Sequence, residues 1–401
     1  MEVGTLKAKA QQERVNAESR GAGWEPDAVT RVENGVVELV VRSEGGHLAE
    51  FRFSGADGAA SPNVLWESTW RHDRLEDTSA EDLAKTAGFT GHGLCLDYFG
   101  GPSAEEKARG MVQHGEAARA VWELFSSEAG GEDAAHWRVD LPIAQLSFER
   151  KVRLGSGESV VFIEETVTNR RDAEHVCDWV QHATFGPPFV TSEDTSFVAS
   201  GARGLTAPDG YGADSLVASG LEFDWPFAPA DGPEAGVVDL RRPFATRGKG
   251  ITAAVEMDPR RSVEFIAAVN CKYGLGVGYC FRREDFPWMM VWEENCVRQD
   301  EPWLGTAQAR GMEFGSTPLP SGREVTLRRG RLFDTPSWCT LAAHEVKKAR
   351  YVMFLFWVPD ECDNVTDVTV HGDSIDFAGD DGAFAFSIPA HGCEEFLSSG
   401  H

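Results

Sequence analysis

Alternating apolar and polar residues, interrupted by short turns, set the strongest limit on how this chain can fold. Ala144–Leu154 alternates, residues 155–158 (Gly-Ser-Gly-Glu) form a turn, and the alternation resumes in Ser159–Thr168 and Val176–Thr184. A period of two is typical of strands that bury one face. Glycine and proline fall largely between these stretches, as turns require. We therefore expect an all-β protein, a large antiparallel sandwich or barrel, rather than a doubly wound fold.

Helical periodicity is confined to two short stretches, Ala80–Lys85 and Leu341–Lys348. The strand-like stretches follow one another without the alternating helices of a parallel sheet. We expect residues 1–30 to form an N-terminal arm and residues 31–350 to form one large β-domain. Short strands after position 350 predict a C-terminal β extension, residues 351–401, packed on the same domain.

Charge and hydropathy narrow the classes of partner. The 38 Lys and Arg against 64 Asp and Glu give a formal net charge of −26, which disfavours nucleic acid and anionic lipid surfaces. The longest apolar run, Tyr351–Pro359, is too short to span a membrane, and Met1–Thr30 has no apolar signal segment. The eight cysteines form no CxxC pair, and no His or Cys spacing is that of a metal site. We expect a soluble cytoplasmic protein with reduced thiols and no metal.

Two of the eleven histidines have unusual surroundings. His182 lies on an apolar strand that stops at residues 186–188 (Gly-Pro-Pro), so it is near a sheet end, where functional sites often open. On such a strand Val180, His182 and Thr184 share one face, whereas Gln181 lies on the other. His114 stands in a Gln-His-Gly-Glu segment ahead of a tryptophan-containing strand. Either histidine could instead be a hydrogen-bonded core residue.

Glu313 is an isolated carboxylate in a glycine-bracketed apolar stretch, residues 310–318. Charged residues are rarely buried without a partner, so it either faces solvent or lies in a pocket. Burial would raise its pKa toward values useful for general-base work. The plain alternative is a salt bridge with Arg310.

Tryptophans are abundant around this glutamate, among them Trp292 and Trp303, and the chain has twelve in all. Aromatic faces stack on the C–H faces of sugars, so the pattern indicates carbohydrate binding. Large sandwiches also use aromatic side chains to fill their cores, and the count fits both interpretations.

Taken in order, these motifs resemble the galactose mutarotase-like superfamily, whose best-known members are the aldose 1-epimerases. The features are a His-Gly followed by a tryptophan strand, an aromatic-flanked strand histidine and a late glutamate in a glycine-rich turn. The nearest likeness is to a bacterial aldose 1-epimerase-like branch with a similar His-x-x-Phe-Gly-x-Pro strand end. The stretch Arg150–Pro188 is the most specific part, and the likeness spans Val36–Asp334.

The resemblance implies a large antiparallel β supersandwich that binds a monosaccharide in a groove on its sheet. It assigns Glu313 as the base that takes the proton of the anomeric hydroxyl and His182 as the acid that protonates the ring oxygen. His114 would hydrogen-bond the sugar near that oxygen. Ring opening and reclosure would then interconvert the anomers of a hexose or hexose derivative, without metal or cofactor.

The sequence also departs from the family pattern. Gln181 stands where an asparagine is usual, and the expected arginine before the His-Gly segment has no clean match, so that His92 or Asp97 could contribute instead. We therefore predict Gln181, His92, Asp97, Trp292 and Trp303 as substrate-binding residues. Three alternatives stay open: a non-catalytic carbohydrate-binding or sensing protein, a glycosidase or lyase acting on a larger glycan, and a structural β-domain whose pocket is vestigial.

Overall fold

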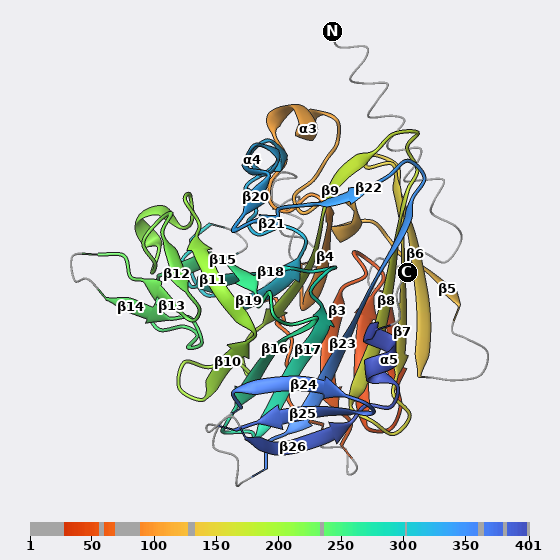
Figure 1. The fold of residues 1–401 in the computed structure, drawn as a ribbon, viewed down its shortest axis with the longest axis vertical. Helices are drawn as coiled ribbons and strands as arrows, with labels where there is room; N and C mark the ends of the chain where they lie inside the picture. The colour runs from red at the N-terminus through yellow and green to blue at the C-terminus, as the bar shows by residue number, and fades with distance from the viewer. Residues whose placement is uncertain are drawn as a thin grey trace.

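Two large antiparallel sheets and a smaller three-stranded one form the layers of the protein in the computed structural model (Figure 1). The structure describes residues 28–55, 60–68, 89–126, 133–232, 236–300, 303–359, 365–379 and 383–398. Sheet 1 has eleven strands in the spatial order β1 (Val29–Glu33), β2 (Val37–Arg42), β3 (Leu48–Phe53), β4 (His92–Asp97), β9 (His175–Phe185), β19 (Gln308–Gly315), β18 (Trp288–Asn295), β15 (Gly250–Met257), β11 (Gly201–Thr206) and β12 (Glu222–Asp224), with β22 (Cys339–Leu341) paired to β9.

Sheet 2 packs face to face against sheet 1. Its eight strands run in the order β10 (Thr195–Ala199), β16 (Val263–Asn270), β17 (Leu275–Arg282), β23 (Val346–Trp357), β8 (Val160–Asn169), β7 (Leu146–Leu154), β6 (Ala134–Leu141) and β5 (Glu123–Ser126). The largest cluster of buried apolar side chains draws on the inner faces of both sheets, as in a sandwich. The strands predicted on either side of the turn at residues 155–158 are β7 and β8, which pair along their length.

A smaller third layer covers the outer face of sheet 2. It consists of β24 (Asp367–His371), β25 (Ser374–Ala378), β26 (Phe384–Pro389) and helix α5 (Cys393–Ser398). A second apolar cluster joins this layer to β8, β16, β17 and β23; Figure 1 shows the layer crossing one end of sheet 2. The division proposed at residue 350 falls inside β23, which pairs with β17 and β8 in the middle of sheet 2.

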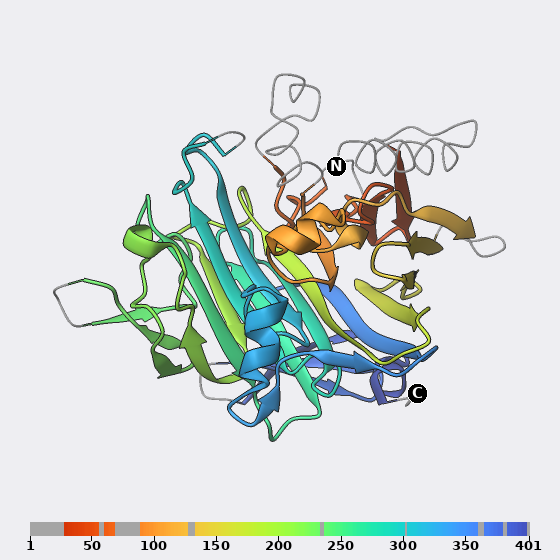
Figure 2. The same ribbon diagram turned by 90° about the horizontal axis from the view of Figure 1, so that it is seen from above.

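Helices are few and short, as predicted. The structure has α3 (Ala104–Ala108), α4 (Arg323–Arg329), α5, and the 3₁₀ turns η2 (Glu116–Ala118) and η3 (Gly212–Asp214), besides the ribbons β13 (Phe227–Pro229) with β14 (Val237–Asp239) and β20 (Arg331–Leu332) with β21 (Thr335–Pro336). Figure 2 shows α3 and α4 together at one end of the sandwich. No helix within the described ranges is long and apolar enough to cross a membrane.

The helix predicted at Leu341–Lys348 is wrong. β22 ends at Leu341, and β23 begins at Val346 and pairs residue by residue with β8. Sheet pairing has overridden a local helical pattern too short to hold a helix by itself. The other predicted helix, Ala80–Lys85, and most of the predicted arm lie outside the described residues.

Candidate active site

A cavity of about 760 Å³ opens on the outer face of sheet 1, the face turned away from sheet 2. Alternation along β9 decides which residues reach it. Val180 belongs to the apolar cluster on the outer face, and His182 lines the cavity. Trp179 and Ala183 belong instead to the inner core. The face assignment made from the sequence is therefore confirmed.

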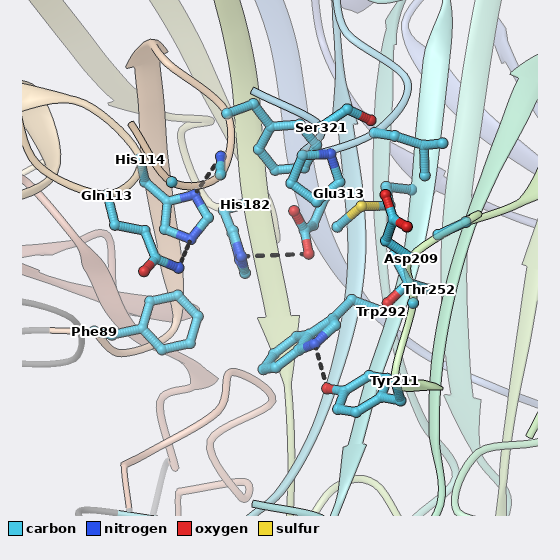
Figure 3. A pocket seen from close by; sticks show the side chains of 18 of the residues that line it. Phe89, Gln113, His114, His182, Asp209, Tyr211, Thr252, Trp292, Glu313 and Ser321 are labelled. Carbon is cyan, nitrogen blue, oxygen red and sulfur yellow. Dashed lines mark hydrogen bonds and ion pairs between the residues drawn. The ribbon is translucent and has the colours of Figure 1, made fainter. Parts of the chain in front are cut away.

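Glu313 lies beside His182 on the neighbouring strand. The register between β19 and β9 pairs Gly311 with Thr184 and Phe314 with Gln181, which places residues 313 and 182 opposite each other. Nε2 of His182 is 3.3 Å from Oε1 of Glu313 (Figure 3). Gly311 leaves the space that this carboxyl occupies, because a Cβ there would be 2.6 Å from Oε1. The glycine bracket in the sequence thus makes room for the acid.

The alternative partner of Glu313, Arg310, is on the other face of the same strand. Its guanidinium donates to Glu293 at 2.8 Å, and both side chains are fully buried. Glu313 accepts no hydrogen bond from the described residues, and both of its carboxyl oxygens are buried. Burial therefore raises the pKa of Glu313 well above its ordinary value.

His182 is held by its second ring nitrogen. Nδ1 is 2.9 Å from the Thr184 hydroxyl, which also donates to the His182 carbonyl oxygen at 3.3 Å. Burial, and then the neighbouring His114, lower the pKa of His182 well below its ordinary value. Both shifts act in the same sense: burial favours the protonated form of the Glu313 carboxyl and the neutral form of the His182 imidazole.

His114 reaches the same cavity from the loop between α3 and η2. The backbone at this residue is left-handed, with φ of 63°. Its Nδ1 accepts a hydrogen bond from the Gly100 N–H at 3.4 Å, and the Gln113 side-chain amide is 3.2 Å from Nε2. The rings of His114 and His182 have centroids 5.3 Å apart. Burial, with Arg119 and Arg298 nearby, lowers the pKa of His114 to about 4.

The structure thus brings His114, His182 and Glu313 together around one cavity, although they are far apart in the chain. Figure 3 shows His114 on one side of His182 and Glu313 on the other. Trp292 and Trp303 also line the cavity. Trp292 donates its indole N–H to the Tyr211 hydroxyl at 2.7 Å, and the Arg298 guanidinium lies 4.6 Å from the Trp303 ring centroid. Aromatic side chains therefore form the wall facing the histidines.

Gln181 and His92 do not reach the cavity. Both point inward from sheet 1, where Nε2 of His92 is 3.0 Å from Oε1 of Gln181. Gln181 donates to Glu165, which is also paired with Arg150 at 2.8 Å. These side chains satisfy one another in the core between the sheets, and Gln181 is on the inner face for the same reason that His182 is on the outer one.

Asp97 is also turned away from the cavity. It ends β4 with φ of 73°, and its Oδ1 lies 2.5 Å from Nε2 of His175 and 2.6 Å from the Arg323 guanidinium. Asp97 therefore ties the end of β4 to β9 and α4, and we leave it out of the site proposed below.

Sequence reasoning missed a third cavity histidine, His47, in the segment just before β3. Its ring occupies the space left by two glycines, since a Cβ at Gly45 or Gly93 would meet it at 2.4 Å and 2.9 Å. Gly93 is the register partner of His182, so His47 lies close to the acid–base pair. Burial lowers the pKa of His47 to about 3. The Gly-Gly-His sequence at 45–47 was the available signal.

The polar rim of the cavity comes from loops. Asp209 and Tyr211 precede η3, Asp300 and Arg298 follow β18, and Arg119 follows η2. Nothing in the periodicity of these loops indicated a common location. No cluster of three or more His, Cys, Asp or Glu side chains suited to a metal ion occurs in the part of the chain that the structure describes.

Sequence comparison finds no protein-family model and no curated protein that matches this chain. Solved structures do match. A galactose mutarotase-like protein from Clostridium acetobutylicum is 14% identical, with 82% of this chain and 95% of that one aligned at a TM-score of 0.55. A galactose mutarotase related enzyme from Lactobacillus acidophilus is 12% identical, with 83% and 99% aligned at a TM-score of 0.52.

An aldose epimerase homologue from C. elegans is 10% identical, with 83% of this chain and 99% of that one aligned at a TM-score of 0.54. Likeness at this level of identity establishes the architecture. The chain has the galactose mutarotase-like sandwich fold, as the motifs predicted, and its cavity lies on the outer face of one sheet of that sandwich.

Proposed function

We propose that this protein is a carbohydrate-active isomerase of the aldose 1-epimerase type, which interconverts the anomers of a hexose or hexose derivative. The observation that carries the proposal is the meeting of Glu313, His182 and His114 at one cavity, with Glu313 and His182 3.3 Å apart. Anomer interconversion needs one acid and one base at a single acetal centre. A carboxyl and an imidazole 3.3 Å apart can supply both.

Either member of the Glu313–His182 pair can serve as the acid while the other serves as the base. One group takes the proton of the anomeric hydroxyl while the other protonates the ring oxygen, so the C1–O5 bond breaks and an aldehyde forms. Rotation about C1–C2 and the reverse transfers close the other anomer. In the free protein the raised pKa of Glu313 and the lowered pKa of His182 favour Glu313 as the acid and His182 as the base. These roles are opposite to those implied by the family resemblance.

His114 and the aromatic wall would hold the sugar. Because Nδ1 of His114 accepts from the Gly100 N–H, the neutral ring carries its proton on Nε2 and can donate it to a sugar hydroxyl. Trp292 and Trp303 would pack against the apolar face of the ring. The proposed chemistry needs no metal or cofactor.

The test is anomer exchange measured by polarimetry on freshly dissolved D-glucose and D-galactose. Glu313→Gln removes the exchangeable proton and should lower the protein-catalysed rate by about 10²-fold or more while keeping sugar binding. Glu264→Gln is the matched control, because Glu264 is a fully buried carboxyl on β16 that does not line the cavity. Full activity of Glu313→Gln would contradict the proposal.

A second candidate is a carbohydrate-binding protein without catalysis. It is favoured by one observation: both carboxyl oxygens of Glu313 are buried in the free protein, so a sugar must displace neighbouring side chains to reach them. Sugar binding by calorimetry with no anomer exchange above the buffer rate would select this candidate. A glycosidase would need a second carboxylate facing Glu313. Glu293 is paired with Arg310 and Glu294 accepts from the amides of residues 297 and 298, whereas Asp300 lines the cavity rim.

A further inference from the structure

Two loops that line the cavity are tied to each other. Phe99–Gly101 follows β4, and Leu319–Ser321 follows β19. A β-bridge joins Gly100 to Ser321. His114 rests on the first loop, because its backbone N–H donates to the Gly100 carbonyl oxygen at 2.9 Å and its Nδ1 accepts from the Gly100 N–H at 3.4 Å. The position of His114 therefore depends on where these loops are held.

One carboxylate holds both loops. Oδ2 of Asp178 accepts from the Phe99 N–H at 2.9 Å, and Oδ1 accepts from the Thr317 hydroxyl at 2.6 Å. Asp178 is on the outer face of β9, four residues before His182. It is 5% exposed and does not line the cavity, so it cannot contact a sugar there.

We propose that Asp178 is a positioning residue, whose ionised carboxylate clamps the two loops, holds His114 at the cavity and so makes sugar affinity depend on pH. This inference rests on the proposed sugar site. A carboxylate accepts hydrogen bonds at both oxygens, and such charge-assisted bonds are about twice as strong as neutral ones. Protonation turns one oxygen into a donor and weakens the clamp.

The groups around Asp178 set the pH at which its carboxylate is protonated. Burial raises the pKa of Asp178 to about 6, against the lowering effect of its hydrogen bonds from Thr317 and Phe99 and of Arg323 on α4. Asp97 at the end of β4 raises it further. Cys177 on β9 and Cys95 on β4 are further titratable groups close to Asp178, and His175 on β9 contacts Asp97.

Ionisation of Asp178 lowers the stability of the folded protein. A folded-state pKa of about 6 against an ordinary 3.8 means that the ionised form is disfavoured by folding, so the fold is less stable above pH 6 than it would be with a neutral side chain.

The experiment compares wild type with Asp178→Asn, which fixes the neutral state, and Thr317→Val, which removes one of the two bonds. D-galactose affinity by calorimetry and the ring signals of ¹³C-labelled His114, assigned with His114→Gln, are followed from pH 5 to 7.5. We expect wild-type affinity to fall about 5- to 10-fold on acidification with a midpoint near 6, together with a shift of the His114 signal. Asp178→Asn should show, at every pH, the weak affinity and the His114 signal that wild type shows at pH 5. Its melting temperature at pH 7.5 should be unchanged or higher.

Thr317→Val should lower affinity at pH 7.5 and keep part of the pH step. The inference is overturned if Asp178→Asn keeps the wild-type His114 signal and the step near pH 6. It is also overturned if the variant loses affinity only in proportion to lost thermal stability. If wild type does not bind D-galactose, the His114 signal alone decides the role of Asp178, and the proposed function is decided separately by the anomer-exchange assay on both sugars.

Discussion

Gly311→Ala tests the geometry of the acid–base pair without removing any functional group. The new Cβ would lie 2.6 Å from Oε1 of Glu313 and 3.2 Å from the Trp292 ring, against an ordinary contact of at least 3.4 Å. The carboxyl must therefore move by about 0.8 Å, which changes its 3.3 Å contact with His182. Misplacement of a reacting group by about 1 Å costs about 10²-fold in rate. We expect a loss of this order in anomer exchange by polarimetry.

The accompanying cost in stability should be modest, about 1–3 kcal/mol by urea unfolding, as for other overpacked sites. Gly278→Ala is the matched control. Its Cβ would meet the Phe354 ring at 2.4 Å, but on a strand of sheet 2 remote from the cavity. It should lose stability and keep activity. Wild-type exchange rates in Gly311→Ala would refute the argument that this glycine houses the carboxyl.

Two further predictions concern buried charges. Arg150→Met leaves Glu165 without its buried ionic partner at 2.8 Å and should cost about 3–5 kcal/mol by urea unfolding; a loss below 1 kcal/mol would show that the pair adds little to the core. Burial raises the pKa of Glu264 from 4.5 to about 7, so its ionisation destabilises the fold as the pH rises through that interval. Relative to wild type, Glu264→Gln should gain about 2–3 kcal/mol between pH 5 and pH 8, and a pH-independent difference between the two proteins would contradict the assignment.

Local alternation was enough to predict the sheet and the faces of its strands. The pattern around β9 placed His182 on the side of Val180 and Thr184, where the cavity lies. Glycines beside Glu313 indicated a pocket, and Gly311 does provide it. These features depend on neighbours within a few residues, which is the range that a single sequence reports well.

Other parts of the site depend on strand order, which local pattern does not contain. His47 lies near His182 because β3 pairs with β4, and β4 places Gly93 opposite His182 on β9. Asp178 on β9 bonds to Phe99, which follows β4, and to Thr317, which follows β19. The family resemblance supplied the three central residues instead.

Residues proposed only to fill a gap in the family pattern had no such support. His92 and Gln181 are engaged with each other in the core, as the alternation along β9 already required for Gln181. Asp97 was proposed because its segment fills the region where the family's arginine has no match. Its left-handed backbone turns it toward His175 and Arg323. The sequence shows that a polar residue stands at a strand end, but it does not show which way the side chain points there.

The most direct measurement is two-dimensional NMR exchange spectroscopy on equilibrated D-glucose and D-galactose with catalytic amounts of the protein. The account predicts cross-peaks between the α and β anomeric protons of at least one sugar, which grow with protein concentration and disappear in Glu313→Gln. Anomer exchange at the buffer rate for both sugars with wild type, or equal exchange with Glu313→Gln, would contradict it.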